Sequence, residues 1–378
     1  MEASGARENE TMNGKILKMT DYPHGARVLL AMSGGVDSAV SAVRLTEAGF
    51  DVTGITMKNY CYGDMADTGK SCCSLDAIDD ARAVCDRMGI RHMVVSTEEL
   101  FGAEVFDNFV NEYRAARTPN PCVRCNSIVR FDTLWRYAVS LGITLVATGH
   151  YARVFRSNAG RFFVARPAYA AKDQSYFLSG VSGEMLSRVI FPLGEVAKPE
   201  VRARARDCGL PVADKPESQE VCFIPDGSLR GFLDGRVNLR SGPIEMADGE
   251  VVGRHAGLAV YTVGQRRGLG VALGEPQYVV RLDADRNAVV IGPEEALLEQ
   301  DVSCRLGWVD AIVERKGSAL RAQIRSRSAA ADVASVRAEG DVLHVRFATP
   351  QRAVAPGQTL ALYDGDVVVG AGVIERDV

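Results

Sequence analysis

The feature that most constrains this chain is a glycine-containing loop, residues 33–38 (SGGVDS), between a strand pattern and a helix pattern. The apolar run 28–32 precedes the loop, and the amphipathic stretch 39–48 follows it. Glycine permits positive φ and close approach to a ligand, and the first N–H groups of a helix attract an anion. The pattern therefore predicts a strand–loop–helix turn that binds nucleotide phosphates. The residues expected to contact the nucleotide here are Ala31, Met32, Ser33, Gly34, Gly35, Val36, Asp37 and Ser38.

Asp37 adds a carboxylate to this anion site. The carboxylate would repel phosphate unless a Mg²⁺ ion bridged the two, so we expect magnesium held through Asp37. The loop lacks the lysine of the Walker pattern, and it resembles the pyrophosphate-binding loop (PP-loop) of enzymes that convert ATP to AMP and pyrophosphate. A glycine turn without any ligand is the alternative.

The composition limits the classes of protein to which the chain can belong. Its 378 residues predict two or three domains, and its net charge of −4 requires that any nucleic-acid contact be a local basic surface. Nine cysteines, an odd number, favour a reducing compartment, and we expect a cytoplasmic protein without a membrane span. The polar residues 1–24 are expected to form a disordered leader.

Apolar strand patterns alternate with helical patterns from residue 27 to residue 211. Strands are expected at 52–57, 92–95 and 144–148, and helices at 75–88 and 128–141. This alternation predicts a doubly wound parallel sheet over residues 25–215, which would bind ligands beyond the carboxyl ends of its strands. We therefore expect the loop, Met57 and Gly149 to face one crevice.

Beyond residue 215 the pattern changes. Glycine-rich stretches and short alternating runs, such as 258–263 and 278–282, predict a small β-rich domain over 216–295. Further short strands at 322–324, 342–347 and 359–363, separated by turn dipeptides, predict a C-terminal β-barrel over 296–378.

Cysteines form a second candidate site. Cys122 and Cys125 follow a proline-containing loop and precede a helix pattern, a position that lowers the pKa of a thiol and favours the thiolate. The sequence has no second CxxC pair, so a four-cysteine zinc ribbon is not expected. Cys222 lies in a polar stretch at the expected domain junction, and on residue type alone it is either a reactive thiol or an inert buried residue.

Several short motifs follow the loop in a fixed order. They are 57–59 (MKN), 117–121 (RTPNP), 147–151 (ATGHY), 172–178 (KDQSYFL), 221–224 (VCFI), 262–270 (TVGQRRGLG) and 354–358 (VAPGQ). The ordered set closely resembles the tRNA-specific 2-thiouridylase family of the PP-loop ATP pyrophosphatase superfamily. The resemblance extends from about residue 27 to the C-terminus, and it implies that the first domain is adenine nucleotide alpha hydrolase-like.

What the resemblance implies is an enzyme that thiolates the wobble uridine of certain tRNAs. ATP adenylylates O2 of the uracil, and a persulfide sulfur then attacks C2, giving 2-thiouridine, AMP and pyrophosphate. By position, Cys222 matches the family's persulfide cysteine and Cys125 matches its partner nucleophile, while Met57 and Gly149 match the adenosine pocket. The implied partners are the tRNA anticodon loop and a protein that donates or relays sulfur.

The resemblance and the basic residues also indicate where tRNA would bind. The expected contacts are Asn120, His150, Lys172, Asp173, Gln174, Arg266, Arg267, Arg325, Arg327 and Gln358. A predicted helix carries Lys198, Arg202, Arg204 and Arg206, and a predicted strand face carries Arg321, Arg325 and Arg327. Such faces suit phosphate contacts, but a solvated charged surface explains them equally well. His150 is also consistent with a purely structural imidazole.

One position departs from the family pattern. The family commonly has an aspartate where this chain has Cys122, so the acid–base role of a carboxylate does not carry over, and Cys122 is a candidate replacement. Cys122, Cys125 and Cys222 together would suit a sulfur-carrying [4Fe–4S] cluster with an open fourth position, which we treat as a hypothesis. No role is assigned to Cys61, Cys72 and Cys73.

Two other functions stay open. Some PP-loop enzymes adenylylate small carboxylates or amides, as in amidotransferase-type synthetases, but these need neither a persulfide cysteine nor a terminal barrel. A nucleotide-binding or redox module without catalysis is less well supported. The glycines at 268–274 lack the dinucleotide spacing, and 69–71 (GKS) lacks the upstream glycine of a Walker loop.

Overall fold

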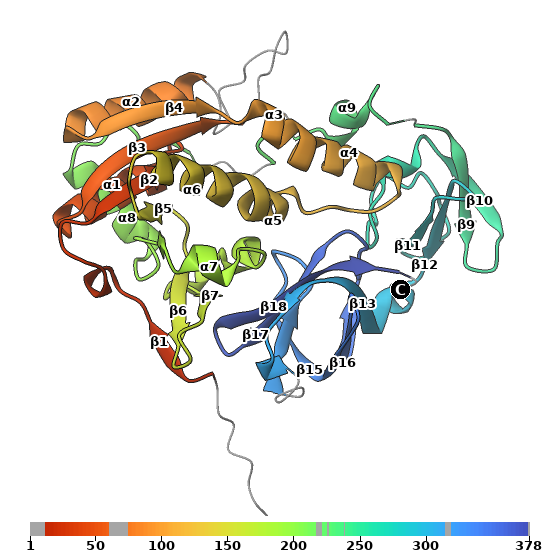
Figure 1. Ribbon diagram of the computed structural model, residues 1–378. Helices are drawn as coiled ribbons and strands as arrows, with labels where there is room; N and C mark the ends of the chain where they lie inside the picture. Colours follow the sequence, from red (N-terminus) through yellow and green to blue (C-terminus); the bar gives the residue numbers. More distant parts are fainter. Residues whose placement is uncertain are drawn as a thin grey trace, which may run out of the picture.

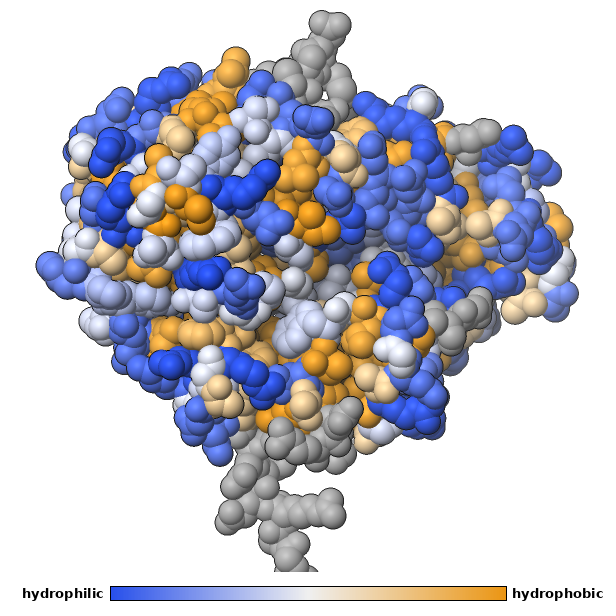
Figure 2. Space-filling model, viewed as in Figure 1, coloured by the Kyte–Doolittle hydropathy of each residue, from blue (hydrophilic) through white to orange (hydrophobic). Residues whose placement is uncertain are grey.

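The computed structural model describes residues 12–59, 75–216, 221–224, 227–237, 239–313 and 319–376. An α/β part comes first in the chain, followed by a small β-rich part and a barrel (Figure 1). Figure 2 shows hydrophilic residues over much of the same face, with hydrophobic patches between them. Cys61, Cys72, Cys73 and the GKS sequence at 69–71 lie outside the described residues.

The first part is built on a five-stranded parallel sheet in the order β4–β3–β2–β5–β8. The strands are β2 (Arg27–Ala31), β3 (Asp51–Lys58), β4 (Arg91–Ser96), β5 (Leu145–Ala147) and β8 (Val189–Ile190). β3 and β5 lie on opposite sides of β2, so the strand order reverses there. The carboxyl ends of β2 and β5 therefore form a topological switch point, where sheets of this kind bind ligands.

Helices cover both faces of this sheet. Val28 and Leu30 of β2 share one apolar cluster with α1 (Val36–Glu47), α2 (Leu75–Met88) and α8 (Lys198–Asp207). Leu29 belongs to a different cluster with α6 (Phe131–Ser140) on the opposite face. This alternation follows from the two-residue period of a strand, and it confirms the predicted doubly wound sheet.

Two helical rods contain wide turns. In one, α3 (Glu98–Phe101), a π-helical turn (Gly102–Phe106) and α4 (Asp107–Arg114) run end to end. In the other, α5 (Pro121–Arg124) and a π-helical turn (Cys125–Arg130) lead into α6. Both π turns contribute to one apolar cluster, which includes Val105, Cys125 and Phe223.

The C-terminal part is a closed antiparallel barrel, as predicted. Its strands follow the order β18–β13–β16–β15–β14–β17, and β17 pairs with β18 to close the ring. They are β13 (Leu298–Val309), β14 (Arg321–Gln323), β15 (Ala331–Glu339), β16 (Val342–Arg352), β17 (Thr359–Asp364) and β18 (Val367–Glu375). The hairpin β6 (Arg153–Ser157) and β7 (Phe162–Ala165) meets β18, so backbone pairing links the first part to the barrel.

The middle part holds a four-stranded sheet in the order β10–β9–β12–β11. These strands are β9 (Gly242–Met246), β10 (Val251–His255), β11 (Tyr278–Asp283) and β12 (Ala288–Gly292). Tyr261 and Leu269, from the glycine-rich segment, complete its apolar cluster. Two short helices, α7 (Gly183–Leu186) and α9 (Leu229–Leu233), lie in the connections that precede it.

Three expectations about local structure are wrong. Residues 12–24 of the expected leader are structured, because β1 (Gly14–Ile16) pairs with β6. Residues 258–263 do not form a strand, because a 3-10 turn, Leu258–Val260, follows Gly257, whose φ is 143°. β14 ends at Gln323, so Arg325 and Arg327 lie in a turn and do not share a strand face with Arg321.

Candidate functional site

The predicted phosphate loop connects β2 to α1. Gly34 has a φ of 65°, and Gly35, the N-cap of α1, makes no side-chain cap bond. Ser38 Oγ accepts from Ser33 N at 3.2 Å and donates to Gly35 O at 3.0 Å, which braces the loop from within. The loop therefore presents the uncapped N–H groups and the positive end of a 12-residue helix to a ligand.

Glycines allow two neighbouring segments to approach this loop. A Cβ on Gly34 would lie 2.1 Å from Ala77 O in α2. A Cβ on Gly149 would lie 3.0 Å from Asp37 C and Ser38 N. Gly149 therefore lies against the start of α1, next to the phosphate loop. Met57, at the end of β3, is buried in the cluster on the α6 face, and its place in an adenosine pocket stays a prediction.

Asp37 belongs to an ion pair that the sequence analysis missed. Lys198 Nζ, at the start of α8, lies 2.7 and 2.8 Å from the two carboxylate oxygens of Asp37. Tyr151 OH donates to Asp37 Oδ1 at 2.8 Å. The Lys198 side chain is 8% exposed and that of Asp37 is 32% exposed, so the pair is largely screened from water on the lysine side. A buried ammonium group thus offsets the carboxylate charge that the sequence analysis assigned to Mg²⁺ alone.

A second lysine braces the phosphate loop. Lys215 Nζ donates to Gly34 O at 3.1 Å and also pairs with Asp80 of α2. No sequence motif distinguishes Lys198 or Lys215 from ordinary surface lysines, because their partners come from distant parts of the chain. The Lys-Pro step at 198–199 does indicate a helix start, but not the pairing.

The basic face predicted for α8 is occupied by contacts within the protein. Lys198 is buried at the phosphate loop rather than exposed on a surface. The other members bind nearby groups: Arg202 donates to Ala213 O and Lys215 O, Arg204 pairs with Glu47, and Arg206 pairs with Asp214. This helix is therefore a poorer candidate for tRNA binding than its sequence indicated.

Cys125 and Cys222 come together although they are far apart in the sequence. Cys125 begins the second π turn and is buried, and Cys222 packs against the same apolar cluster. The ring of Phe223 contacts the rings of Phe101, Phe106 and Phe109. This aromatic packing anchors the segment that carries Cys222 to the rod of residues 98–114, and Cys125 belongs to the same apolar cluster.

Cys122 lies in a different environment. It is exposed in α5, whose N-cap Asn120 accepts from Val123 N at 3.2 Å. Within the part of the chain that the structure describes, no three His, Cys, Asp or Glu side chains are grouped to hold a metal. Cys122, Cys125 and Cys222 therefore do not form a ligand group in the described structure, and the iron–sulfur cluster stays a prediction.

Several residues expected to contact tRNA make contacts inside the protein. Asp173 pairs with Arg166, and Gln174 Oε1 accepts from Tyr151 N at 2.9 Å. Gln358 Nε2 donates to Thr118 O at 2.8 Å, and so fixes the loop that leads to Asn120 and α5. These contacts brace the site; a contact of the same residues with tRNA stays a prediction.

His150 is held between two neighbours. Thr148 Oγ1 lies 2.7 Å from Nδ1, and Arg130 Nη1 lies 3.0 Å from Nε2. Burial and the positive charge of Arg130 lower the pKa of His150 well below its ordinary value. Arg130 can only donate, so Nε2 accepts and Nδ1–H donates to Thr148. The geometry favours the structural alternative for this imidazole.

Four predicted tRNA-binding arginines lie at the surface without an acidic partner among the described residues. Arg266 and Arg267 are exposed in the glycine-rich segment, Arg327 is exposed in the turn after β14, and Arg325 is half-buried there. Lys172 ends a short 3-10 turn, Ala170–Lys172, and is half-buried. Among the predicted tRNA contacts, these four arginines are therefore the basic groups best placed to bind phosphates.

A separate cavity of about 680 Å³ lies between β7, α7 and the start of the barrel. It is lined by apolar side chains that include Phe162, Val181, Leu186 and Trp308. It shares no residue with the phosphate loop or the Cys125–Cys222 cluster, so it is not the site described above.

Family models cover almost the whole chain. The tRNA methyl transferase HUP domain matches residues 26–226, the tRNA methyl transferase PRC-barrel domain matches 230–293, and the aminomethyltransferase β-barrel domain matches 303–374. Among the described residues, no helix combines the length and apolar character needed to cross a bilayer.

Curated relatives match at full length. The tRNA-specific 2-thiouridylase MnmA of Heliobacterium modesticaldum is 46% identical over 360 residues, covering 93% of this chain and 92% of the relative. The MnmA of Geobacter metallireducens is 46% identical over 359 residues, covering 92% of this chain and 96% of the relative. Among solved structures, a 4-thiouridine synthetase–RNA complex with bound ATP aligns at a TM-score of 0.34 and 18% identity. That alignment covers 56% of this chain and 50% of the other.

The glycine-containing loop at the switch point, the apolar cluster shared by Cys125 and Cys222, and the terminal barrel agree with these full-length matches. The chain belongs to the tRNA-specific 2-thiouridylase family.

Proposed function

We propose that this chain carries out the reaction for which its family is named, the ATP-dependent 2-thiolation of the wobble uridine in tRNA. The observation that carries the proposal is the presence of two separate chemical sites in one chain. A phosphate loop contains Asp37, which forms a partly buried ion pair with Lys198, and one apolar cluster includes both Cys125 and Cys222. A synthetase that adenylylates a small carboxylate needs only the first of these sites.

The phosphate loop would bind the pyrophosphate portion of ATP. The N–H groups at the start of α1 supply hydrogen-bond donors, and Lys198 lowers the negative potential of the nearby carboxylate. Asp37 is the residue that would hold Mg²⁺, which neutralises phosphate charge and assists the departure of pyrophosphate when it is bound. Gly149, against the start of α1, leaves room beside the loop for the rest of the nucleotide.

The two cysteines would carry the sulfur. Cys222 holds a persulfide, whose terminal sulfur forms a bond to C2 of the adenylylated uridine while the C2–O bond breaks and AMP leaves. The thiolate of Cys125 then attacks Cys222 Sγ, breaks its bond to the transferred sulfur and releases 2-thiouridine. This step leaves a Cys125–Cys222 disulfide, which a cellular dithiol reductant must reduce before the next turnover. Packing in one cluster favours the approach of the two sulfurs.

The reaction needs two macromolecular partners. One is tRNA, which would contact the two surfaces that bear these arginines: Arg266 and Arg267 on the middle part, and Arg325 and Arg327 on the barrel. The other is a protein that donates or relays sulfur to Cys222. We place the reaction in the cytoplasm, where ATP, tRNA and reduced thiols occur together.

The test is mass spectrometry of nucleosides from unmodified tRNA incubated anaerobically with the protein, ATP, Mg²⁺ and a persulfide donor, which supplies sulfane sulfur to Cys222 without a separate oxidant. We expect 2-thiouridine only when ATP is present, with AMP and pyrophosphate formed in equal amounts. Release of AMP without any thiolated base would retain the PP-loop chemistry and remove the substrate assignment. AMP release that does not depend on tRNA would favour a small-molecule synthetase instead.

A further inference from the structure

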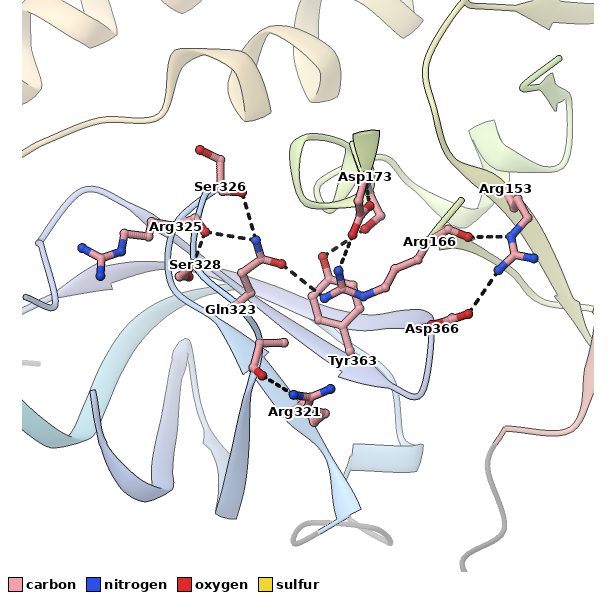
Figure 3. A network of polar contacts seen from close by, with 12 residues as sticks. Arg153, Arg166, Asp173, Arg321, Gln323, Arg325, Ser326, Ser328, Tyr363 and Asp366 are labelled. Carbon is pink, nitrogen blue, oxygen red and sulfur yellow. Dashed lines mark hydrogen bonds and ion pairs between the residues drawn. The ribbon is translucent and has the colours of Figure 1, made fainter. Parts of the chain in front are cut away.

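A polar network joins the first part of the chain to the barrel (Figure 3). Its centre is Arg166, which directly follows β7. Arg166 Nη1 pairs with Asp173 Oδ2, and Nη2 donates to Gln323 Oε1 at 3.3 Å. The guanidinium also lies 4.0 Å from the ring centroid of Tyr363. The side chains of Arg166 and Asp173 are 25% and 14% exposed, so solvent screens their interaction only in part.

Gln323 extends this network into the turn formed by residues 324–328. Its Nε2 donates to Arg325 O at 3.0 Å and to Ser326 O at 3.2 Å. Ser328 adds two further donors to Arg325 O, from its N at 3.1 Å and from its Oγ at 3.0 Å. Three donors on one carbonyl fix the backbone of the turn. The side chain of Arg325 extends away from these contacts (Figure 3).

The turn carries two guanidinium groups, Arg325 and Arg327, that pair with no carboxylate in the described ranges. Other arginines of the barrel differ in this respect. Arg321 pairs with Asp332 on the adjacent strand, and Arg346 pairs with Asp301. Unpaired guanidinium groups on a fixed turn are suited to bidentate contacts with RNA phosphates.

The other end of the network reaches the nucleotide site. Asp173 Oδ1 accepts from Ser175 N at 2.9 Å, which fixes the segment that contains Gln174. Gln174 binds Tyr151 through two hydrogen bonds, from Gln174 N to Tyr151 O at 3.0 Å and from Tyr151 N to Gln174 Oε1 at 2.9 Å. Tyr151 OH in turn donates to Asp37. The segment 173–174 is therefore attached both to the phosphate loop and to the barrel turn.

We infer that Arg166 and Gln323 are positioning residues that hold the 324–328 turn as a phosphate-docking surface for tRNA, at a set position relative to the phosphate loop. The inference rests on the proposed function, because it assumes that tRNA is the substrate. Arg166 and Gln323 act through the turn and need not touch the RNA. Arginine suits this position because its planar fork binds Asp173 and Gln323 at once while its face covers Tyr363.

The test compares steady-state kinetics of thiolation for wild type, Gln323→Met, Arg166→Lys and the double variant Arg325→Met/Arg327→Met. Gln323→Met removes the amide group that donates to the carbonyls of the turn. Arg166→Lys keeps a positive charge beside Asp173 but removes the planar guanidinium that also binds Gln323. Each should raise the KM for tRNA about three- to tenfold, the effect of one or two hydrogen bonds. The kcat at saturating tRNA and the KM for ATP should change less than about twofold, since the phosphate loop keeps its own contacts. Arg346→Met, which removes an exposed barrel arginine that is paired, is the matched control and should leave the KM for tRNA unchanged.

Two further measurements separate positioning from general stability. In the background of Arg325→Met/Arg327→Met, Gln323→Met should raise the KM for tRNA no further, because its effect passes through those two arginines. The double variant should also reduce the slope of log affinity against log salt concentration, by about one for each phosphate that the arginines no longer bind.

The possible outcomes separate a failure of the proposed function from a failure of the positioning role. If wild type makes no 2-thiouridine, the proposed function fails and this inference fails with it. If wild type is active and the double variant weakens tRNA binding, but Gln323→Met and Arg166→Lys do not, the positioning role alone is overturned. A fall in kcat, ATP affinity and melting temperature together in Gln323→Met would show a general structural role and would also overturn it.

Discussion

The Lys198–Asp37 pair gives the sharpest prediction for the nucleotide site. Lys198→Met removes the ammonium group but keeps most of the apolar stem, and it leaves the Asp37 carboxylate beside the phosphate loop with the Tyr151 hydroxyl. The carboxylate then repels an incoming phosphate. We therefore expect weaker ATP binding and a lower free energy of unfolding.

The size of the effect follows from the geometry. Opposite charges about 4 Å apart attract by about 4 kcal/mol at an effective dielectric constant of about 20. Removing one partner of a fully buried pair costs about 3–5 kcal/mol, and an exposed pair contributes about 0–1 kcal/mol. Since Asp37 is 32% exposed and Lys198 is 8% exposed, this pair lies between the two limits. Lys198→Met should therefore lower the free energy of unfolding by about 2 kcal/mol, and a loss of the same size in ATP binding would raise the dissociation constant of ATP about thirtyfold.

The assay is a double-mutant cycle with Lys198→Met, Asp37→Asn and both together, measured by isothermal titration with ATP and by urea unfolding. The double variant removes both charges, so its loss of stability should be smaller than the sum of the two single losses. The difference, which is the coupling energy, should be about 1 kcal/mol or more. Additive losses, within about 0.5 kcal/mol, would refute the view that the two charges act as a pair. Asp37→Ala alone would be a weaker test. It removes both carboxylate contacts of Lys198, so a loss of activity could not be separated from a loss of stability.

Three further predictions concern the cysteines, a glycine and a histidine. Cys125→Ser and Cys222→Ser should each abolish 2-thiouridine while tRNA-dependent release of pyrophosphate, the product of adenylylation, still occurs; loss of pyrophosphate release as well would contradict separate sites for the two steps. Gly149→Ala should raise the KM for ATP roughly tenfold, because the new Cβ would lie 3.0 Å from Asp37 C and Ser38 N; an unchanged KM would remove Gly149 from the nucleotide site. Burial and Arg130 lower the pKa of His150 well below 6.5, so the unfolded chain takes up a proton that the folded chain does not. The stability attached to His150 should thus be complete above pH 6.5 and decline as the pH falls below it, and His150→Gln should flatten melting temperature against pH in that range.

Much of the first part could be predicted because its patterns are local. The helix expected at 75–88 is α2 with those same bounds, since its apolar residues recur at helical spacing. The strand expected at 52–57 is β3, extended by one residue at each end. The phosphate loop was also predictable, because both its glycines and its flanking elements are contiguous in the sequence.

The contacts that complete the site were not predictable, because they join distant segments. Lys198 and Asp37 are separated by 161 positions, and a lysine that begins a helix rich in arginine resembles a solvated residue. Arg325 was expected to lie on a strand. In the structure the side chain of Gln323 binds the carbonyls of residues 325 and 326, which form a turn, and the strand ends at Gln323. Counting cysteines likewise does not reveal that Cys122 is exposed while Cys125 is buried.

The π turns have a consequence for chain length. A π turn closes its hydrogen bonds over five residues rather than four, so it holds about one residue more than an α-helix turn of the same rise. Deleting one residue within 102–106 or 125–130 can therefore be absorbed by conversion to an α turn, with the helices on either side kept in phase. The same deletion within 131–140 would rotate all later side chains of α6 by about 100° and carry Leu134 and Ala138 away from the sheet. The two π turns are thus the positions where these helical rods tolerate the loss of a residue. A deletion in the turn that begins at Cys125 would keep the fold but would move the Cys125 side chain.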